Sequence, residues 1–170
     1  MQPAKPRRNR RPLYTRLIVL AVIAVIAIGY SVYKSSQNAK VSSNGAVTKA
    51  GSLSVFSLAK GQCFNEPATG QDVSTVKAIP CSQPHDAQVT GTATLTETTY
   101  DETAINTDAG NQCSTVADDA VVSNDLGENA SVIYFVPDED DFNTNADRTV
   151  TCAGDNGGTK LNGSVLKSGD

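Results

Sequence analysis

The stretch Leu17–Tyr33 reads LIVLAVIAVIAIGYSVY and contains no charged residue, although a basic residue bounds it on each side. As an α-helix, a segment of this length would rise about 26 Å, close to the thickness of the hydrocarbon core of a bilayer. Tyr30 and Tyr33 lie near one end, where aromatic side chains commonly meet the lipid headgroups. The stretch therefore predicts a single transmembrane helix over residues 17–34.

Basic residues are distributed unevenly about this segment. Residues 1–16 contain several Lys and Arg residues and no acidic residue, whereas few basic residues follow the apolar run. Lys and Arg that flank a span are retained preferentially in the cytoplasm. We therefore expect residues 1–16 to be a basic cytoplasmic tail. The chain would be a single-pass protein of the plasma membrane, with its C-terminal part outside the cytoplasm.

A cleaved signal peptide also begins with a basic region followed by an apolar region, so cleavage is an alternative. The apolar run here is longer than is typical of a signal peptide. In addition, Gln37-Asn38-Ala39 lacks the small residue that an A-x-A cleavage site has at its first position. The sequence favours an uncleaved anchor that inserts into the lipid bilayer through residues 17–34.

The chain beyond the apolar run is expected to form a linker and one domain. Residues 35–51 are small and polar without periodicity, which predicts a flexible linker. Residues 52–170 suffice for a single extracytoplasmic domain. Residues 35–170 hold all 18 acidic residues of the chain and half of its 14 basic ones, a net charge of −11. Such a domain repels polyanions, which excludes nucleic-acid binding and is compatible with a cationic partner.

Four cysteines lie in the predicted outer domain, at Cys63, Cys81, Cys113 and Cys152. An even number of cysteines in a small extracytoplasmic domain indicates two disulfides, for which three pairings are possible. We favour Cys63–Cys81 and Cys113–Cys152, because each pair joins elements that follow one another in the chain. A metal site is disfavoured, because the sequence has no CxxC motif and only one histidine, His85, and we expect no cofactor.

The outer domain shows the patterns of several strands and one helix. Alternating or β-branched runs predict strands at residues 53–58, 73–81, 87–95, 131–137, 148–153 and 161–166. Gly91 inside one of them predicts a bulge or a close backbone approach. Thr99-x-x-Glu102 has the spacing of a capping box. Apolar residues at helical spacing follow it, which predicts a helix that buries its Cys113 face and ends near residues 124–127.

This order of elements predicts an α+β fold. A small, mainly antiparallel sheet would carry one packed helix, with the disulfides as braces. Such braces would matter here, because a domain without tryptophan and with few phenylalanines can build only a thin core.

Several motifs resemble one known family. Gly61-Gln-Cys63-Phe64, followed by Val76–Val89 (VKAIPCSQPHDAQV), resembles the opening of the septum formation domain of actinobacterial single-pass membrane proteins. That family has the pattern G-D-C-(F/L), then V-x-x-V-x-C-x-x-P-H-x-x-E-V. Residues 148–152 (RTVTC) and 161–164 (LNGS) resemble its closing elements. Gln62 stands where the family has Asp, and Gln88 where it has Glu. The resemblance implies a membrane-anchored envelope domain linked to cell division.

Two interpretations of the pair Cys81 and His85 are open. A cysteine and a histidine can form a nucleophile and its base. The favoured interpretation is a disulfide cysteine followed by a Pro84-His85 turn whose imidazole caps backbone groups. Pro84, His85 and Arg148 are candidate recognition residues. Residues 141–147 (Asp-x-Asn-x-Asn-x-Asp) alternate oxygen-bearing side chains as a Ca²⁺ loop does but lack the glycine and glutamate of an EF-hand, which favours a solvated acidic loop over residues 138–147.

The leading functional hypothesis is a non-enzymatic, membrane-tethered domain that binds or scaffolds envelope or division proteins. Its partner proteins are not identified by the sequence. The alternatives are an envelope enzyme, either a hydrolase or a thiol-redox protein, that uses Cys81 and His85, and a ligand-sensing ectodomain.

Overall fold

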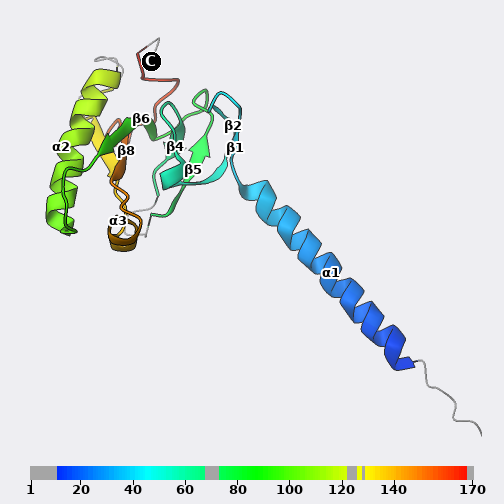
Figure 1. The fold of residues 1–170 in the computed structure, drawn as a ribbon. Helices are drawn as coiled ribbons and strands as arrows, with labels where there is room; N and C mark the ends of the chain where they lie inside the picture. Colours follow the sequence, from blue (N-terminus) through cyan, green and yellow to red (C-terminus); the bar gives the residue numbers. More distant parts are fainter. Residues whose placement is uncertain (1–10, 68–72, 122–125, 128, 168–170) are drawn as a thin grey trace, which may run out of the picture. The chain divides into compact units, whose positions relative to one another are not determined.

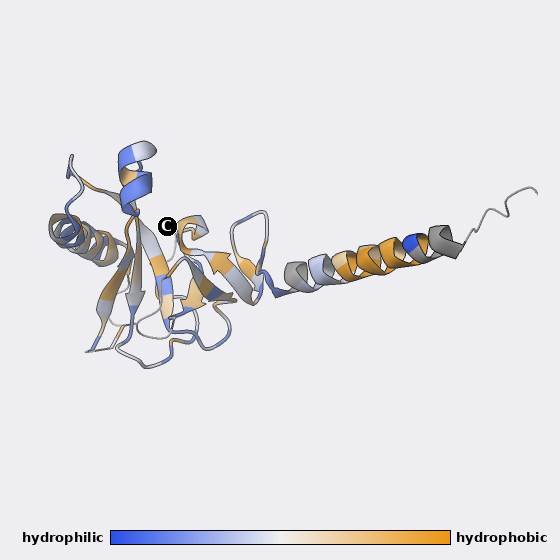
Figure 2. Ribbon diagram, turned by 90° about the horizontal axis from the view of Figure 1, so that it is seen from below, coloured by the Kyte–Doolittle hydropathy of each residue, from blue (hydrophilic) through white to orange (hydrophobic). Residues whose placement is uncertain are grey.

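The computed structural model describes residues 11–67, 73–121, 126–127 and 129–167. The chain forms two compact units, Met1–Gln37 and Asn38–Asp170, which are described separately. The described part of the first unit is helix α1 (Arg11–Gln37). Every side chain of α1 that the structure describes, at residues 16–31, 33 and 37, is exposed, and Figure 2 shows the continuous apolar run along this helix. Within the described residues, no helix has both the length and the hydropathy needed to cross a membrane.

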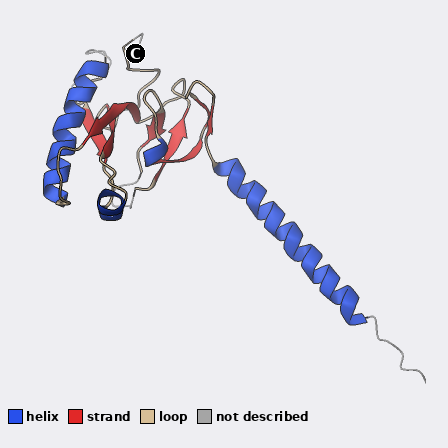
Figure 3. Ribbon diagram, viewed as in Figure 1, coloured by secondary structure: helices blue, strands red, loops and turns tan. Residues whose placement is uncertain are grey.

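The second unit is built on a six-stranded sheet whose neighbouring strands are antiparallel (Figure 3). The strands follow the order β3-β5-β4-β6-β8-β7 across the sheet. Their bounds are Gly51–Ser54 for β3, Cys63–Asn65 for β4, Thr75–Ile79 for β5, Ala87–Thr94 for β6, Ser131–Phe135 for β7 and Thr149–Asp155 for β8. Helix α2 (Glu102–Ala120) packs against β6, β8 and β7 (Figure 1). The predicted α+β fold, with an antiparallel sheet and one packed helix, is confirmed.

Alternation along the central strands divides the core into two layers. Successive side chains of a strand point to opposite faces of the sheet, so Val150 and Cys152 of β8 face α2, whereas Ala153 faces the other side. The α2 side holds Leu95, Ile105, Ala109, Cys113, Phe142, Val150 and Cys152. The opposite side holds Val55, Leu58, Phe64, Val76, Ala87, Val89 and Ala153. The short 3-10 helix η1 (Val55–Ser57) contributes to this second layer.

Helix α2 begins and ends at other residues than the sequence predicted. Asp101 is its N-cap, and the Asp101 carboxylate accepts a hydrogen bond of 2.8 Å from the backbone N–H of Ala104. The predicted capping box at Thr99 is therefore wrong, because Asp101 fills the capping position two residues later. The helix ends at Ala120, and Val121 instead pairs with Leu166 in an isolated β-bridge, so the predicted end near residues 124–127 is also wrong.

The segment expected to be a flexible linker, residues 35–51, contains regular structure. Helix α1 continues to Gln37, and a hairpin of β1 (Lys40–Val41) and β2 (Val47–Lys49) follows it. Val47 is buried, and the Gln62 side chain donates a hydrogen bond of 2.8 Å to the Gly45 carbonyl. Strands of two or three residues are too short to show periodicity, which is why the sequence did not reveal them. The compact unit starts at Asn38, ahead of the predicted boundary at residue 52.

Three further segments differ from their predicted forms. Residues 53–58 are a strand only to Ser54, after which η1 begins. Residues 161–166 make single β-bridges rather than a strand. Within residues 138–147, α3 (Glu139–Thr144) replaces the expected acidic loop, because Asp138 caps it by accepting from the Asp141 N–H at 2.8 Å. Phe142 of this short helix is buried in the core, which a pattern of mostly polar residues does not reveal.

Gly91 lies at a bulge where the sheet and α2 come close together. The register of β6 against β8 shifts between Val89 and Gly91. A Cβ at Gly91 would lie 2.9 Å from Cγ1 of Val116 on α2. A valine in a helix is nearly fixed at χ1, so this contact cannot be relieved by a simple rotation. The sequence predicted a bulge or a close approach at Gly91, and the structure has both.

Two glycine-to-alanine substitutions are expected to change stability in opposite directions. We expect Gly91→Ala to lower the free energy of unfolding by about 1–3 kcal/mol, because the new methyl group overpacks against Val116. Gly110→Ala, in the middle of α2, should raise it by about 0.5–1 kcal/mol, because a Cβ there meets Tyr134 only at 3.6 Å and alanine favours the helix. Urea unfolding of both variants checks this, and a neutral effect at Gly91 would contradict the close approach.

Candidate functional site

Both favoured disulfides are present. Cys63 of β4 is linked to Cys81, which follows β5, and Cys113 of α2 is linked to Cys152 of β8. In each pair the Cα atoms are 5.2 Å apart. The first link follows from the pairing of β4 with β5, which places Cys63 opposite Ile79. The second joins the buried face of α2 to the sheet. No described cysteine is free.

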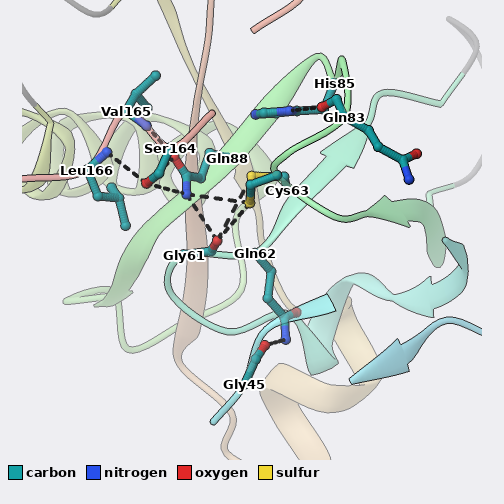
Figure 4. Close-up of a disulfide and its surroundings, with 11 residues drawn as sticks. Gly45, Gly61, Gln62, Cys63, Gln83, His85, Gln88, Ser164, Val165 and Leu166 are labelled. Atoms are coloured by element: carbon teal, nitrogen blue, oxygen red, sulfur yellow. Dashed lines mark hydrogen bonds between the residues drawn. A yellow bond between two sulfur atoms is a disulfide. The ribbon is translucent and has the colours of Figure 1, made fainter. Parts of the chain in front are cut away.

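Gln88 is the polar centre of the region around the first disulfide (Figure 4). It is 1% exposed. Its Nε2 donates to the Gly61 carbonyl at 3.0 Å and to the Ser164 hydroxyl at 2.9 Å. Its Oε1 accepts from the Val165 N–H at 2.7 Å. A neutral amide can donate and accept at the same time, so it satisfies both neighbours without placing a charge in the core.

His85 is fully buried, and its ring serves the turn in which it lies. The ring Nδ1 is 2.8 Å from the Gln83 carbonyl oxygen (Figure 4), so Nδ1 carries the proton and donates it. The His85 backbone forms both hydrogen bonds of a bridge with Leu161. Nε2 is buried and has no hydrogen-bond partner among the described residues. The interpretation of the imidazole as a backbone cap is confirmed, whereas Pro84 beside it is exposed.

Alternate residues of the segment 161–165 form hydrogen bonds with residues 81–88. Leu161 pairs with the backbone of His85, the Gly163 N–H donates to the Cys81 carbonyl at 3.0 Å, and Val165 binds Gln88. The segments that resemble the opening and the closing elements of one family therefore contact each other directly. The sequence did not reveal this role of Gln88. The available signal was a polar residue on a strand whose first five residues, 87–91, are all buried.

Arg148 lies apart from this region and also has an internal role. Its Nη1 donates to the carbonyls of Phe142 and Asp147, at 2.6 Å and 3.0 Å. Its guanidinium lies 3.3 Å from the centroid of the Phe142 ring, a cation–π contact. Tyr100 packs edge-on against the same ring. Arg148 thus fastens α3 to the start of β8, and the structure does not bring it together with Pro84 and His85.

An acidic group of side chains lies where β4 and β8 end and β6 begins. Lys160 Nζ is 2.6 Å from an Asp86 carboxylate oxygen and 3.1 Å from the Asn65 side-chain oxygen. The Glu66 N–H donates to the other oxygen of Asp86 at 3.1 Å. Partial burial raises the pKa of Glu66, and the neighbouring carboxylates of Asp155 and Asp86 raise it further. Among the described residues, no group of three His, Cys, Asp or Glu side chains is arranged to hold a metal ion.

Next to Glu66, an open groove of about 390 Å³ lies on the face of the sheet opposite α2. Its walls are mostly apolar and come from three places: Val55 and Phe56 of η1, Phe64 of β4, and Ile133 and Phe135 of β7. None of the sequence-predicted site residues lines it. The sequence could not indicate this groove, because its walls are ordinary core-forming residues from distant parts of the chain.

The fold and the bonded cysteines define a small α+β domain braced by two disulfides, preceded in the chain by an apolar helix. The family model for septum formation matches residues 30–153. The chain therefore belongs to the septum formation family, which associates it with cell division. No curated protein and no solved structure matches the chain.

Replacing the amide of Gln88 by a carboxyl tests its place in the core. In Gln88→Glu an ionised carboxyl would face the Gly61 carbonyl and have no proton to donate to it. Burial and this repulsion raise the pKa of the new carboxyl above that of an exposed glutamate. The protonated form is thus tolerated, and stability is lost as the pH rises through the raised pKa.

We expect this variant to lose about 1–3 kcal/mol of unfolding free energy at neutral pH, and less at pH 5. Thermal unfolding across this pH range measures the effect. Gln83→Glu, at an exposed position of the turn before β6, is the matched control and should behave as the wild type at both pH values. An unchanged melting temperature for Gln88→Glu would contradict the assigned hydrogen bonds.

Proposed function

We propose that this protein is a membrane-anchored extracytoplasmic domain with a non-enzymatic binding or scaffolding role in septum formation. The observation that carries the proposal is the family match over residues 30–153, which includes the end of the apolar helix and most of the disulfide-braced domain. Membership of the family directs the proposal to cell division. The remaining parts, the anchor, the compartment and the mode of action, rest on the arguments below.

Anchoring is proposed from the sequence and exposure of α1. The whole uncharged stretch Leu17–Tyr33 is helical, and those of its large apolar side chains that the structure describes are each more than half exposed, with Val25 at 69%. Exposed apolar surface of this extent costs roughly 25 cal/mol for each Å² in contact with water. A lipid environment removes that cost. The basic residues before the stretch favour a cytoplasmic N-terminus.

The compartment is proposed from the cysteines. Two disulfides in one small domain are typical of proteins that fold where thiols are oxidised, outside the cytoplasm. This compartment agrees with the orientation that the basic tail favours. Both arguments are independent of the family match, since one uses the charge around α1 and the other the covalent structure of the second unit.

A binding role rather than catalysis is proposed from the state of Cys81 and His85. The sulfur of Cys81 is bonded to Cys63, so it offers no thiolate. The imidazole of His85 is buried and engaged with the Gln83 carbonyl. The nucleophile–base alternative would require reduction of the disulfide and movement of the ring. A rigid domain with an open apolar groove is suited instead to holding a partner.

Placing charges in α1 tests the anchor and the division role together. In cells that normally make this protein, a tagged full-length chain should remain with membranes after alkaline carbonate extraction and should accumulate at septa. The double variant Ile23→Arg/Ile26→Arg should be lost from the membrane fraction and from septa, because each arginine in a span costs about 2.5–3.5 kcal/mol. Val41→Arg/Thr98→Arg adds the same charge at exposed positions outside α1 and should keep both. Equal behaviour of the two variants would refute the anchor, and a membrane-bound protein absent from septa would refute the division role.

Counting thiols tests the compartment. When cells are lysed in an alkylating reagent, the full chain should carry no alkylated cysteine, and its mass should rise by four hydrogens on reduction. Peptide mapping should recover Cys63 linked to Cys81 and Cys113 linked to Cys152. Alkylation of all the cysteines without reduction would place the domain in a reducing compartment. It would also restore Cys81 as a candidate nucleophile.

A further inference from the structure

Strand β7 forms one edge of the six-stranded sheet. In the strand order, β8 is its only neighbour among the described residues. An edge strand presents a row of backbone N–H and C=O groups on its outer side that can pair with another chain. The β7 sequence, SVIYF, consists almost entirely of β-branched and aromatic residues, the types most favourable in a strand. Ile133 and Phe135 are only partly buried.

The groove next to β7 would receive side chains of a strand added at this edge. The side chains of Ile133 and Phe135 form one wall, and η1 forms the other. On that second wall Phe56 remains 49% exposed, so it is a large aromatic side chain with little to cover it. An incoming strand would place alternate side chains toward this face. The groove therefore provides pockets for apolar residues at every second position.

The charge at one end of the groove indicates which further side chain would bind. Glu66 lines the groove, and the carboxylates of Asp155 and Asp86 act on it electrostatically. Lys160 opposes them, but its ammonium is already paired with Asp86 at 2.6 Å. A second cation beside Glu66 would relieve the repulsion among these carboxylates.

We propose that β7 and the adjoining groove bind an extended segment of a partner protein by strand addition, with alternating apolar residues and a lysine or arginine facing Glu66. This inference deepens the proposed binding function and rests on it. A second copy of this chain is a poorer occupant, because it would bring the same acidic group and a domain charge of −11 to the interface. The five residues of β7 would pair with a partner segment of similar length.

Synthetic peptides test the proposal on the full chain in detergent micelles. The probe is a fluorescent, end-blocked heptapeptide, Lys-Thr-Val-Thr-Val-Thr-Lys, whose two lysines lie on the same face of the strand as its valines, and its binding is followed by anisotropy. Its matched partner has glutamate in place of both lysines and should not bind. Two further versions carry N-methyl groups on alternate residues, so that each blocks one edge of the peptide strand. Only one of these two should bind, because strand addition uses a single edge.

Variants of the chain assign the binding to the groove. Phe56→Ala should weaken binding of the lysine peptide by about fivefold or more. Glu66→Gln should weaken it by about two- to fivefold. The matched controls are Val41→Ala and Asp140→Asn, exposed positions that do not line the groove, and they should bind as the wild type does. Because Phe56 and Glu66 are exposed, all four variants should keep the wild-type melting temperature.

Specific results would overturn the proposal. Equal binding of the lysine and glutamate peptides would remove the role of Glu66, and binding of both N-methylated versions would exclude strand addition. If the chain forms a dimer and Phe56→Ala abolishes that dimer, the occupant of the groove is a second copy of the chain instead. The wild type and the groove variants are also tested in cells for retention in the membrane and for accumulation at septa. If the peptides fail to bind while the wild-type chain remains in the membrane and at septa, the partner class is wrong and the proposed function stands.

Discussion

The covalent link between Cys113 and Cys152 is the constraint on which the rest of the domain depends. It ties the buried face of α2 to β8, which lies between β6 and β7 in the sheet. The layer between helix and sheet holds small and medium-sized apolar side chains and a single phenylalanine, Phe142, so apolar burial alone gives a modest gain. Closing a loop of this size in the unfolded chain contributes about 3–4 kcal/mol in the chain-entropy description. A helix with a weakly apolar face can thus remain seated on the sheet.

The sequence predicted the features that depend on local pattern and missed those that depend on partners far along the chain. The sequence analysis predicted the strands around Val76, Val89 and Val132 and the buried face of α2. It also predicted both disulfides and the bulge at Gly91. The hairpin at residues 40–49 was missed, because its strands are short and Gln62 supplies a contact that no local pattern encodes. The cap at Asp101 was missed because Thr99 and Glu102 have the spacing of a capping box, whereas the cap that forms is the aspartate directly before the helix.

The candidate recognition residues were predicted less well than the fold. Pro84 is exposed, but His85 is buried in a turn and Arg148 binds Phe142. A polar residue in a recurrent motif can serve either a partner or the protein's own backbone, and the sequence alone does not separate these uses. Gln62 and Gln88 illustrate the second use, since both are buried and hydrogen-bonded within the domain. The groove on the face of the sheet opposite α2 is lined instead mostly by apolar residues, several of which the sequence analysis assigned only to strands.

The attachment of residues 161–165 to residues 81–88 has a consequence for how the protein is made. A ribosome delivers the N-terminal part first, so β6 is synthesised well before the Leu161 and Val165 backbones that complete its surroundings. Until those residues emerge, Gln88 has no partner in Ser164 or Val165. The domain can therefore reach its final form only after residues 161–165 have left the ribosome, and a polypeptide interrupted before them would expose its unfinished interior to quality-control proteases.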